Sequence, residues 1–330
     1  MTTLSSGEGG TASLVIAGPN LTIDRTMRVS ELVPGRVLRA TEVEATPGGK
    51  GLNVGRAALV IGVPATLVSF APGHTGRAAA ALIAEAGVRL RAVPCPGEIR
   101  STAVVMEDGG RVTVLNEPGP PVTADLWRSY EAEITAALGG AGALVCSGSL
   151  PPGAPIRAYA NLAELARSRG VVSVVDVSGA PLGAALEARA DVVVPNLGEA
   201  EALLEGASGE DVAAAADARP RAAAAAVALV RRGARMAVVT AAAAGAALAV
   251  DGDEGPWWLA APPARVSNPI GAGDAFAAGL AAALARGEPA TVAAREAVAT
   301  GTAGVESPLG GHFDRARMRE LLAQVTLVQA

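Results

Sequence analysis

The sequence predicts an α/β protein with a mostly parallel sheet that helices cover on both faces. Three observations lead to this fold class. Strand-like apolar runs alternate with helical stretches along most of the chain, a rhythm typical of parallel sheets. The chain has 330 residues, enough for a large core. Its residues are 50% hydrophobic but only 2% aromatic, so Ala, Val and Leu must fill that core.

The strands and helices can be followed in order along the chain. Apolar runs predict strands at residues 13–17, 65–70, 144–146, 171–175, 192–194, 236–240 and 246–250. Helical spacing is found at residues 76–86, 154–167, 180–188, 199–204 and 222–232, after Gly49 as far as Gly62, and from Ala275 onward. Because the sequence contains no internal repeat and no long linker, we expect one domain over residues 13–330. We expect residues 1–12 to be a disordered leader.

Two segments stand outside this rhythm and predict a small additional sheet. Residues 36–45 alternate as a strand, with Val37 and Val43 among the apolar positions. Residues 101–106 and 111–115 form a predicted hairpin, because Asp108-Gly109-Gly110 joins them. The small sheet is therefore expected to be inserted at about 25–46 and 98–116.

Composition excludes several classes of function. The net charge is −5, from 27 basic and 32 acidic residues without a basic stripe, which argues against nucleic acid as a partner. The longest uncharged apolar run, at residues 236–250, falls short of the ~20 residues of a membrane span, so no membrane association is expected. Cys95 and Cys146 are too few for a disulfide framework, which favours a reducing, cytoplasmic setting.

Lys50 is the only lysine in the chain, since every other long cationic side chain is Arg. This suggests that position 50 requires a compact ammonium, although chance survival is the alternative. Lys50 lies in a glycine-rich loop, Pro47-Gly48-Gly49-Lys50-Gly51, which leads into the helix that carries Asn53. Glycine lets a ligand approach the backbone there. The loop is not a Walker A motif, because no Ser or Thr follows the lysine.

The segment Gly271-Ala272-Gly273-Asp274 opens a predicted helix and is the candidate for the chemical step. Free amides at a helix N-terminus bind anions, and Asp274 places a possible base beside them. Two alternatives remain open from these residues alone. Asp274 could be an ordinary helix cap. The glycines also resemble a dinucleotide-binding turn, but Pro269 interrupts the strand that should precede it.

Polar residues follow several predicted strands. Asp24 comes just beyond the first strand, residues 147–153 follow the strand that ends at Cys146, and residues 195–199 follow another. Turn and cap chemistry would explain each of them alone. Because carboxyl ends of parallel strands meet at one edge of a sheet, the repetition predicts a binding site there.

The ordered motifs resemble the ribokinase-like (phosphofructokinase-B) carbohydrate kinases, in particular the branch of 1-phosphofructokinase and tagatose-6-phosphate kinase. The resemblance extends from about Ser13 to the C-terminal helix and rests on Thr46-Pro-Gly-Gly-Lys-Gly-Leu-Asn53, Ser147-Gly-Ser-Leu-Pro-Pro-Gly153, Pro195-Asn196 to Glu199, and Gly271-Ala-Gly-Asp274.

The resemblance implies a role for each motif. Asp274 would be the general base, and the amides of Gly271, Ala272 and Gly273 would stabilise the transferring phosphoryl group. The residues that would bind ATP and Mg²⁺ are Asn196, Glu199 (to Mg²⁺ through water), Thr240 and Gly245. Sugar hydroxyls would meet Asp24, Gly49 and Asn53. The fixed phosphate of the substrate would meet Arg36, Lys50, Arg100 and Ser149. The small sheet would be a lid that also forms a homodimer contact.

Two departures from the family pattern bear on these roles. The turn that typically has Ser/Thr-x-Gly-x-x-Gly is here Thr240-Ala-Ala-Ala-Ala-Gly245, and Ala242 tolerates positive φ poorly. Asn268-Pro269 replaces a widespread Asp-Thr, which makes a bound monovalent cation uncertain.

These motifs predict an ATP-dependent kinase of a ketohexose phosphate: fructose 1-phosphate, tagatose 6-phosphate or fructose 6-phosphate. Two alternatives stay open. The chain could phosphorylate an unphosphorylated sugar or nucleoside, or it could be a catalytically weak sugar-phosphate-binding regulator on the same scaffold.

Overall fold

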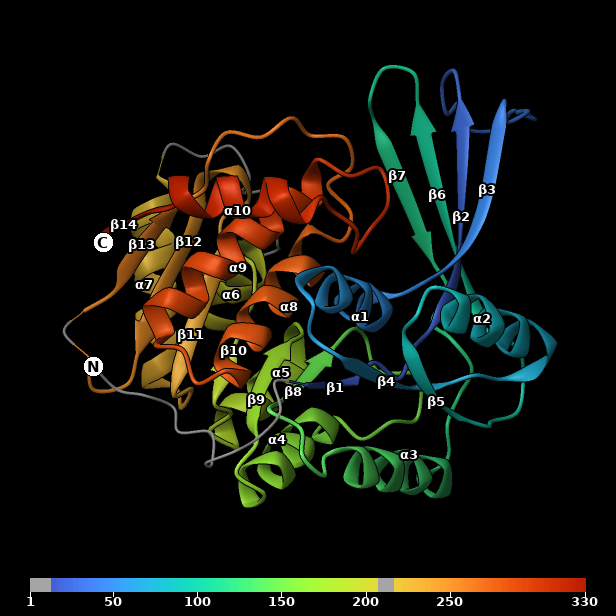
Figure 1. Cartoon of the computed structure of the whole chain (residues 1–330). Helices are drawn as coiled ribbons and strands as arrows, with labels where there is room; N and C mark the ends of the chain where they lie inside the picture. The colour runs from blue at the N-terminus through green and yellow to red at the C-terminus, as the bar shows by residue number, and fades with distance from the viewer. Residues whose placement is uncertain (1–12, 207–216, 254) are drawn as a thin grey trace.

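The computed structural model describes residues 13–206, 217–253 and 255–330, and Figure 1 shows a large sheet with a small sheet standing at one end of it. The leader expected at residues 1–12 lies outside the described residues. Within the described residues the large sheet has ten strands in the order β14-β13-β12-β11-β10-β9-β8-β1-β4-β5. Their bounds are β1 (Leu14–Ala17), β4 (Ala65–Phe70), β5 (Arg89–Val93), β8 (Ala143–Ser147), β9 (Val172–Asp176), β10 (Val192–Val193), β11 (Met236–Thr240), β12 (Gly245–Val250), β13 (Trp257–Ala260) and β14 (Thr326–Gln329).

The large sheet is mostly parallel, as predicted. Neighbouring strands from β5 to β11 are all parallel, and only β12, β13 and β14 extend the sheet with antiparallel pairs. Successive side chains of a strand point to opposite faces. Leu14 and Ile16 of β1 accordingly enter one hydrophobic core, while Val15 and Ala17 enter the other. The predicted fold class is confirmed.

Helices cover both faces of the sheet (Figure 1). The core that contains Leu14 is covered by α1 (Lys50–Ile61), α2 (Gly73–Glu85), α8 (Ala272–Ala285), α9 (Ala290–Val305) and α10 (Arg315–Gln324). The opposite core is covered by α3 (Ala124–Ala137), α4 (Ala158–Ser168), α5 (Gly179–Glu187), α6 (Leu197–Glu205) and α7 (Ala218–Arg231). No helix in the described residues is long and apolar enough to cross a bilayer.

The small sheet has the order β3-β2-β6-β7, and the prediction of a small additional sheet is confirmed. Its strands are β2 (Thr22–Val29), β3 (Glu42–Gly48), β6 (Arg100–Glu107) and β7 (Val112–Asn116). The strand predicted at 36–45 is wrong at its start, because β3 begins only at Glu42. Glu42 pairs with Arg28 near the end of β2, so the preceding residues have no neighbouring strand to pair with. Asp24, expected in a loop, lies inside β2.

The order of the strands places a topological switch point beside β1. From β1 the sheet continues to β4 and β5 on one side, whereas the later strands β8, β9 and β10 lie on the other side. Connections therefore diverge between β1 and β8, and ligands of open α/β sheets bind at such a point. Gly18 follows β1 and Ser147 ends β8, so both lie at this position.

Gly279→Ala and Gly273→Ala add the same methyl group to α8, and we expect opposite effects on stability. A Cβ at Gly279 would lie 2.6 Å from Thr300 Oγ1 and 3.2 Å from Ala297 Cα, which would force α8 and α9 apart. Overpacking costs roughly 1–3 kcal/mol, more than the gain of roughly 1 kcal/mol in helix propensity. A Cβ at Gly273 would meet no atom within 4 Å.

Thermal unfolding measures this difference. The Tm of Gly279→Ala should fall, and that of Gly273→Ala should be unchanged or higher. A similar decrease in both variants would show that Gly273 is required by the fold itself.

Candidate functional site

Asp274 and Asn53 join the N-terminal ends of α8 and α1. Asn53 Nδ2 donates a hydrogen bond to Asp274 Oδ2 at 2.8 Å, and the Asp274 side chain is only 4% exposed. Burial raises the pKa of Asp274 to about 6; the Lys50 charge and the Asn53 hydrogen bond oppose this rise, and Asp176 adds to it. A carboxyl group with this pKa can exchange protons near neutral pH.

Glycine permits the close packing around these helix ends. Gly271, the N-cap of α8, has φ 88°, and a Cβ there would lie 2.8 Å from Gly310 Cα. A Cβ at Gly311 would lie 2.4 Å from the Asn53 carbonyl oxygen. The loop that contains Gly310 and Gly311 therefore packs against the starts of both helices, and no larger residue fits at these positions.

The amides at the start of α8 are not equivalent. Ala272 N donates to Pro269 O at 3.4 Å, whereas the amides of Gly273 and Asp274 have no acceptor within the described part of the chain. Gly273 is exposed and faces open space. Free amides at the positive end of a helix are suited to hold an anion.

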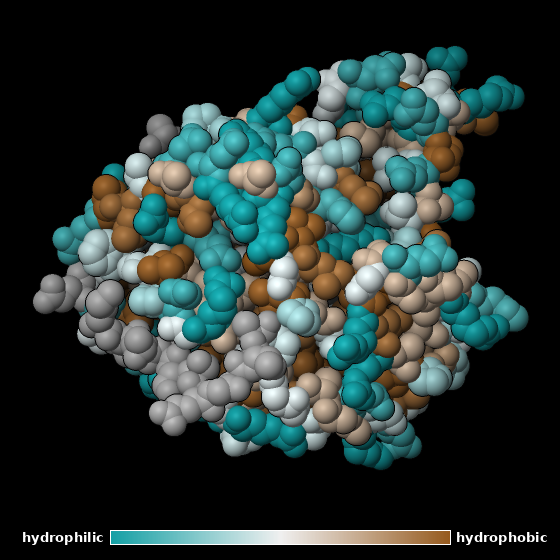
Figure 2. Space-filling view, viewed as in Figure 1, coloured by the Kyte–Doolittle hydropathy of each residue, from teal (hydrophilic) through white to brown (hydrophobic). Residues whose placement is uncertain are grey.

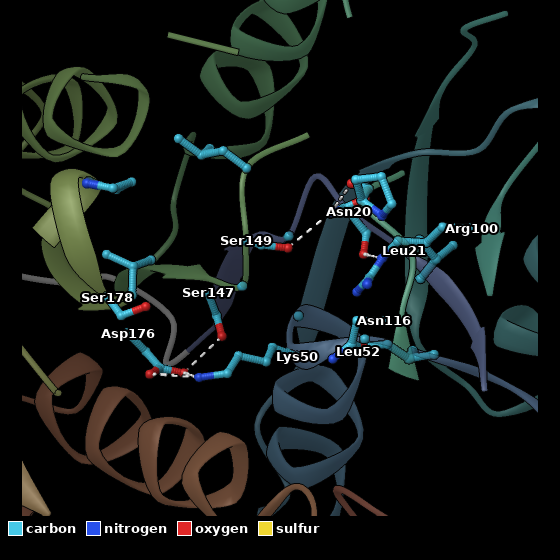
Figure 3. A pocket seen from close by; sticks show the side chains of 18 of the residues that line it. Asn20, Leu21, Lys50, Leu52, Arg100, Asn116, Ser147, Ser149, Asp176 and Ser178 are labelled. Atoms are coloured by element: carbon cyan, nitrogen blue, oxygen red, sulfur yellow. Dashed lines mark hydrogen bonds and ion pairs between the residues drawn. The ribbon is translucent and has the colours of Figure 1, made fainter. Parts of the chain in front are cut away.

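Lys50 is held at one end of a cavity of about 730 Å³ (Figure 3). Its Nζ lies 3.2 Å from Asp176 Oδ1 and 3.3 Å from Asp176 Oδ2, and Ser147 Oγ donates to Oδ2 at 3.0 Å. The carboxylates of Asp176, Asp274 and Glu199 raise the pKa of Lys50, which keeps the ammonium charged. Sequence reasoning missed Asp176, although it ends a strand like the other polar candidates.

The other end of this large cavity contains Asn20, Arg100 and Ser149 (Figure 3). Asn20 Nδ2 donates to Ser149 Oγ at 2.9 Å, and Arg100 Nε donates to Asn20 O at 3.2 Å. Arg100 Nη1 also donates to Glu117 O at 3.1 Å, while Nη2 has no partner among the described residues. The guanidinium is therefore fixed in place with donors left over. Asn20 was not among the predicted site residues; it follows β1 at the switch point.

A second, small cavity of about 290 Å³ lies beneath the small sheet, between Asp24 and Asn53 on one side and Asn268 on the other. Burial raises the pKa of Asp24, and hydrogen bonds with Thr102 and Thr22 oppose this rise. Asp274 interacts electrostatically with both Lys50 in the large cavity and Asp24 in the small one. Gly49 and Lys50 thus line the large cavity, Asp24 and Asn53 line the small one, and Asp274 is connected to both groups through the Asn53 hydrogen bond and the Lys50 charge.

Asn196 and Glu199 form a capping box at the start of α6. Asn196 Oδ1 accepts from Glu199 N, and Glu199 Oε2 accepts from Asn196 N, both at 2.9 Å. Glu199 also lines the large cavity, so the cap does not exclude a ligand there. Thr240 N donates to Pro195 O at 3.1 Å, which places the end of β11 beside Asn196.

The turn after Thr240 adopts a strained shape. Ala242 has φ 47°, in the left-handed region that costs a residue with a Cβ roughly 1–2 kcal/mol. Gly245 has φ 131°, and a Cβ there would lie 2.0 Å from Leu259 O, so the fold itself requires glycine at this position. Ala242 thus has the positive φ that alanine tolerates poorly.

Arg36 is the one predicted phosphate contact that the structure does not bring to the site. It is exposed between β2 and β3, at the tip of the small sheet far from α1, and lines neither cavity. Figure 2 shows mostly hydrophilic residues at this tip. The contact of Arg36 with the fixed phosphate therefore stays a prediction.

Comparisons with known proteins agree with this geometry. The profile described as pfkB family carbohydrate kinase matches residues 13–314. The curated ATP-dependent 6-phosphofructokinase isozyme 2 of Escherichia coli (strain K12) is 31% identical over 285 residues, which cover 85% of this chain and 88% of the relative.

Solved structures show the same fold. Phosphofructokinase-2 from Escherichia coli in complex with potassium has a TM-score of 0.83 at 27% identity, covering 94% of this chain and 98% of its own. A possible 1-phosphofructokinase from Thermotoga maritima has a TM-score of 0.82 over 96% and 99% of the two chains; at 23% identity it supports the fold alone. Since the family profile matches most of its length, this chain belongs to the pfkB family of carbohydrate kinases.

Proposed function

We propose that this chain transfers a phosphoryl group from ATP to a ketohexose phosphate, either fructose 1-phosphate, tagatose 6-phosphate or fructose 6-phosphate. The observation that carries the proposal is Asp274, a buried carboxyl with raised pKa beside free amides of a helix N-terminus. A relative is named 6-phosphofructokinase, and phosphofructokinase-2 from Escherichia coli has been solved in complex with fructose-6-phosphate at 26% identity.

In the proposed reaction Asp274 accepts the proton of the substrate hydroxyl. The hydroxyl oxygen then bonds to the γ-phosphorus of ATP as the bond from that phosphorus to the ADP oxygen breaks. Negative charge spreads over the transferring group, and the amides of Gly271, Ala272 and Gly273 stabilise it. Gly273 has the most open approach, whereas the Ala272 amide must first release its long hydrogen bond to Pro269 O. The Gly273→Ala variant should therefore fold normally but turn over slowly.

The proposed sugar site is formed by residues from the linings of both cavities. Asp24, Gly49 and Asn53 bind hydroxyls there, and a furanose is nearly symmetric end to end. Arg100 and Ser149 take the fixed phosphate, because Arg100 keeps unpaired donors in the large cavity. The other CH₂OH group then reaches Asp274. Arg36, which lines neither cavity, is not needed for this arrangement.

In this proposal Lys50 binds the transferring phosphoryl group and not the fixed phosphate of the sugar. Its charge interacts with Asp274 and Glu199 as well as with Asp176, so it can neutralise phosphate oxygens near the general base. This differs from its expected role at the fixed phosphate. The ion pair with Asp176 is what turns the ammonium toward that end of the cavity.

The nucleotide is proposed to bind at Asn196, Glu199, Thr240 and Gly245. Mg²⁺ is usually held by one or two carboxylates, waters and substrate phosphates, and does not need a cage of protein ligands. No cluster of three acidic, His or Cys residues occurs in the described ranges. Glu199 fits the single-carboxylate pattern, since Oε2 accepts the capping hydrogen bond and Oε1 is left for a metal-bound water. Bound Mg²⁺ would neutralise charge on the phosphates.

We further propose that the chain is cytoplasmic and forms a homodimer through the outer face of the small sheet. Val43 is 56% exposed and Leu115 is 63% exposed on that face, where they neighbour Met27 and Ala103. Apolar side chains on an exposed sheet favour an interface. Phosphofructokinase-2 from Escherichia coli has also been solved in a tetrameric form.

The main test is ATP consumption across sugar phosphates, unphosphorylated sugars and nucleosides, with Asp274→Asn as the control. Asp274→Asn should lower kcat by about 10²-fold or more, because the base is lost while the Asn53 contact can remain. Unchanged turnover would exclude the role of Asp274. Turnover restricted to unphosphorylated acceptors would favour a kinase of an unphosphorylated sugar or nucleoside. No turnover with any acceptor would favour a sugar-phosphate-binding regulator.

The pH dependence provides a second prediction. The base must be ionised, so kcat/KM of the wild type should rise as the pH increases through about 6 and level off above it. In Asp176→Asn this rise should move to lower pH, because Asp176 contributes to raising the pKa of Asp274. An unchanged profile in that variant would contradict the electrostatic coupling.

Arg100→Met and Lys50→Met each remove one positive charge from the large cavity. Arg100→Met removes a charged hydrogen bond and should raise KM for the sugar phosphate by roughly 10–100-fold, with kcat nearly unchanged. Lys50→Met should mainly lower kcat. Steady-state kinetics separate the two effects, and an equal rise in KM for phosphorylated and unphosphorylated sugars in Arg100→Met would contradict a fixed-phosphate site at Arg100.

Ala242→Gly should stabilise the protein by about 0.5–1 kcal/mol, because glycine adopts the positive φ of this position without strain. Since the turn keeps its shape, KM for ATP should stay the same or fall. Ala243→Gly is the matched control, as Ala243 is not among the described residues with positive φ and should be destabilised by glycine. Chemical denaturation measures both, and a loss of stability in Ala242→Gly would contradict the strain.

A further inference from the structure

Asn268 uses both polar atoms of its side chain to fix the segment that leads into α8. Its Nδ2 donates to the Pro308 carbonyl oxygen at 2.9 Å, and its Oδ1 accepts from Ile270 N at 2.9 Å. The first bond crosses to the loop after α9; the second closes a local turn just before Gly271. One neutral side chain thus connects two loops that are far apart in the sequence.

Two further carbonyl oxygens at this junction, those of Val305 and Leu309, have protein donors. Ser267 N and Asn268 N both donate to Val305 O, at 2.7 and 3.2 Å. Leu309 O accepts from His312 N and from Ser307 Oγ, both at 3.2 Å. A monovalent cation such as potassium is held by several converging carbonyl oxygens that replace its water shell. Here N–H and O–H groups already bind the carbonyl oxygens of Val305, Pro308 and Leu309.

The acidic group nearest to this junction in the sequence is also engaged. Glu306 accepts from Arg317 Nε at 2.9 Å and from Arg317 Nη2 at 3.1 Å, and its Oε1 also accepts from Arg265 N at 3.3 Å. At position 268 itself the side chain is an amide without charge. The residues present therefore do not fit a bound monovalent cation.

The junction controls the site through direct packing. Gly310, two residues after Pro308, lies so close to Gly271 that a Cβ on Gly271 would be 2.8 Å from Gly310 Cα. Gly311 packs in the same way on Asn53, which holds Asp274. A shift of the loop at Pro308 would move the start of α8 and the general base with it.

We propose that Asn268 is a positioning residue that joins these two loops by hydrogen bonds, as a bound monovalent cation would do, so that this chain needs no potassium. Its kinetic consequences rest on the proposed kinase function. Its consequences for stability do not, so failure of one can be distinguished from failure of the other.

The wild type provides the first test. Thermal unfolding and kcat/KM are measured in the chloride salts of potassium, sodium and tetramethylammonium at equal ionic strength. Tm should be the same in all three salts, and kcat/KM should agree within about twofold, because an ion that does not bind the native state cannot stabilise it. A rise in Tm or kcat/KM specific to potassium would overturn the inference, whatever the substrate proves to be.

Variants of Asn268 provide the second test. Asn268→Ala should lower kcat by about tenfold in every salt with a smaller change in KM, because a misplaced base slows the chemical step. Asn268→Asp turns a carboxylate toward the Pro308 carbonyl, and the repulsion should lower Tm in tetramethylammonium; potassium should restore it by bridging the two oxygens. Asn161→Asp, on the exposed surface of α4, is the matched control and should respond to no salt.

Hydrogen exchange at Ile270 N gives a readout independent of activity. The amide is bonded to Asn268 Oδ1, so its exchange should be faster in Asn268→Ala than in the wild type. If Asn268→Ala had the same exchange rate at Ile270 N, the same Tm and the same kcat as the wild type, the positioning role would be overturned.

Discussion

The hydrogen bond between Asn53 and Asp274 is the contact on which the site depends. Each residue lies in the first turns of a helix, and each helix packs on the same core, so the bond connects two positive helix ends. The partial charges of both ends favour an anion nearby. Burial opposes ionisation of Asp274, and the balance leaves a carboxyl that can act as a base near neutral pH.

An acidic protein must concentrate cations locally to bind a phosphorylated sugar and ATP. Lys50 stands among three carboxylates, which keep it charged, and is 45% exposed to the large cavity. Arg100 is fixed at the opposite end by backbone carbonyls, which take up donors without neutralising its charge. Both positive charges therefore line the same cavity of about 730 Å³.

Glycine serves two different purposes near the site. At Gly271 and Gly245 a side chain would collide with backbone atoms, so the fold requires glycine whether or not a ligand binds. At Gly273 a side chain would meet only open space. A ligand that approaches the amides closely would explain glycine at that position. The same sequence motif thus combines a structural glycine with one that the proposed phosphoryl transfer requires.

The sequence by itself determined the parallel sheet, the small additional sheet and the motifs around Lys50, Asn196 and Asp274, because periodicity and turn chemistry are local properties. It could not determine which distant residues meet. Asp176 was missed because nothing in its own segment shows that Lys50 will lie 3.2 Å away. The start of β3 was misplaced because the length of a strand depends on its pairing partner. Tertiary structure decided both, since ion pairs and strand ends depend on contacts between segments that only packing brings together.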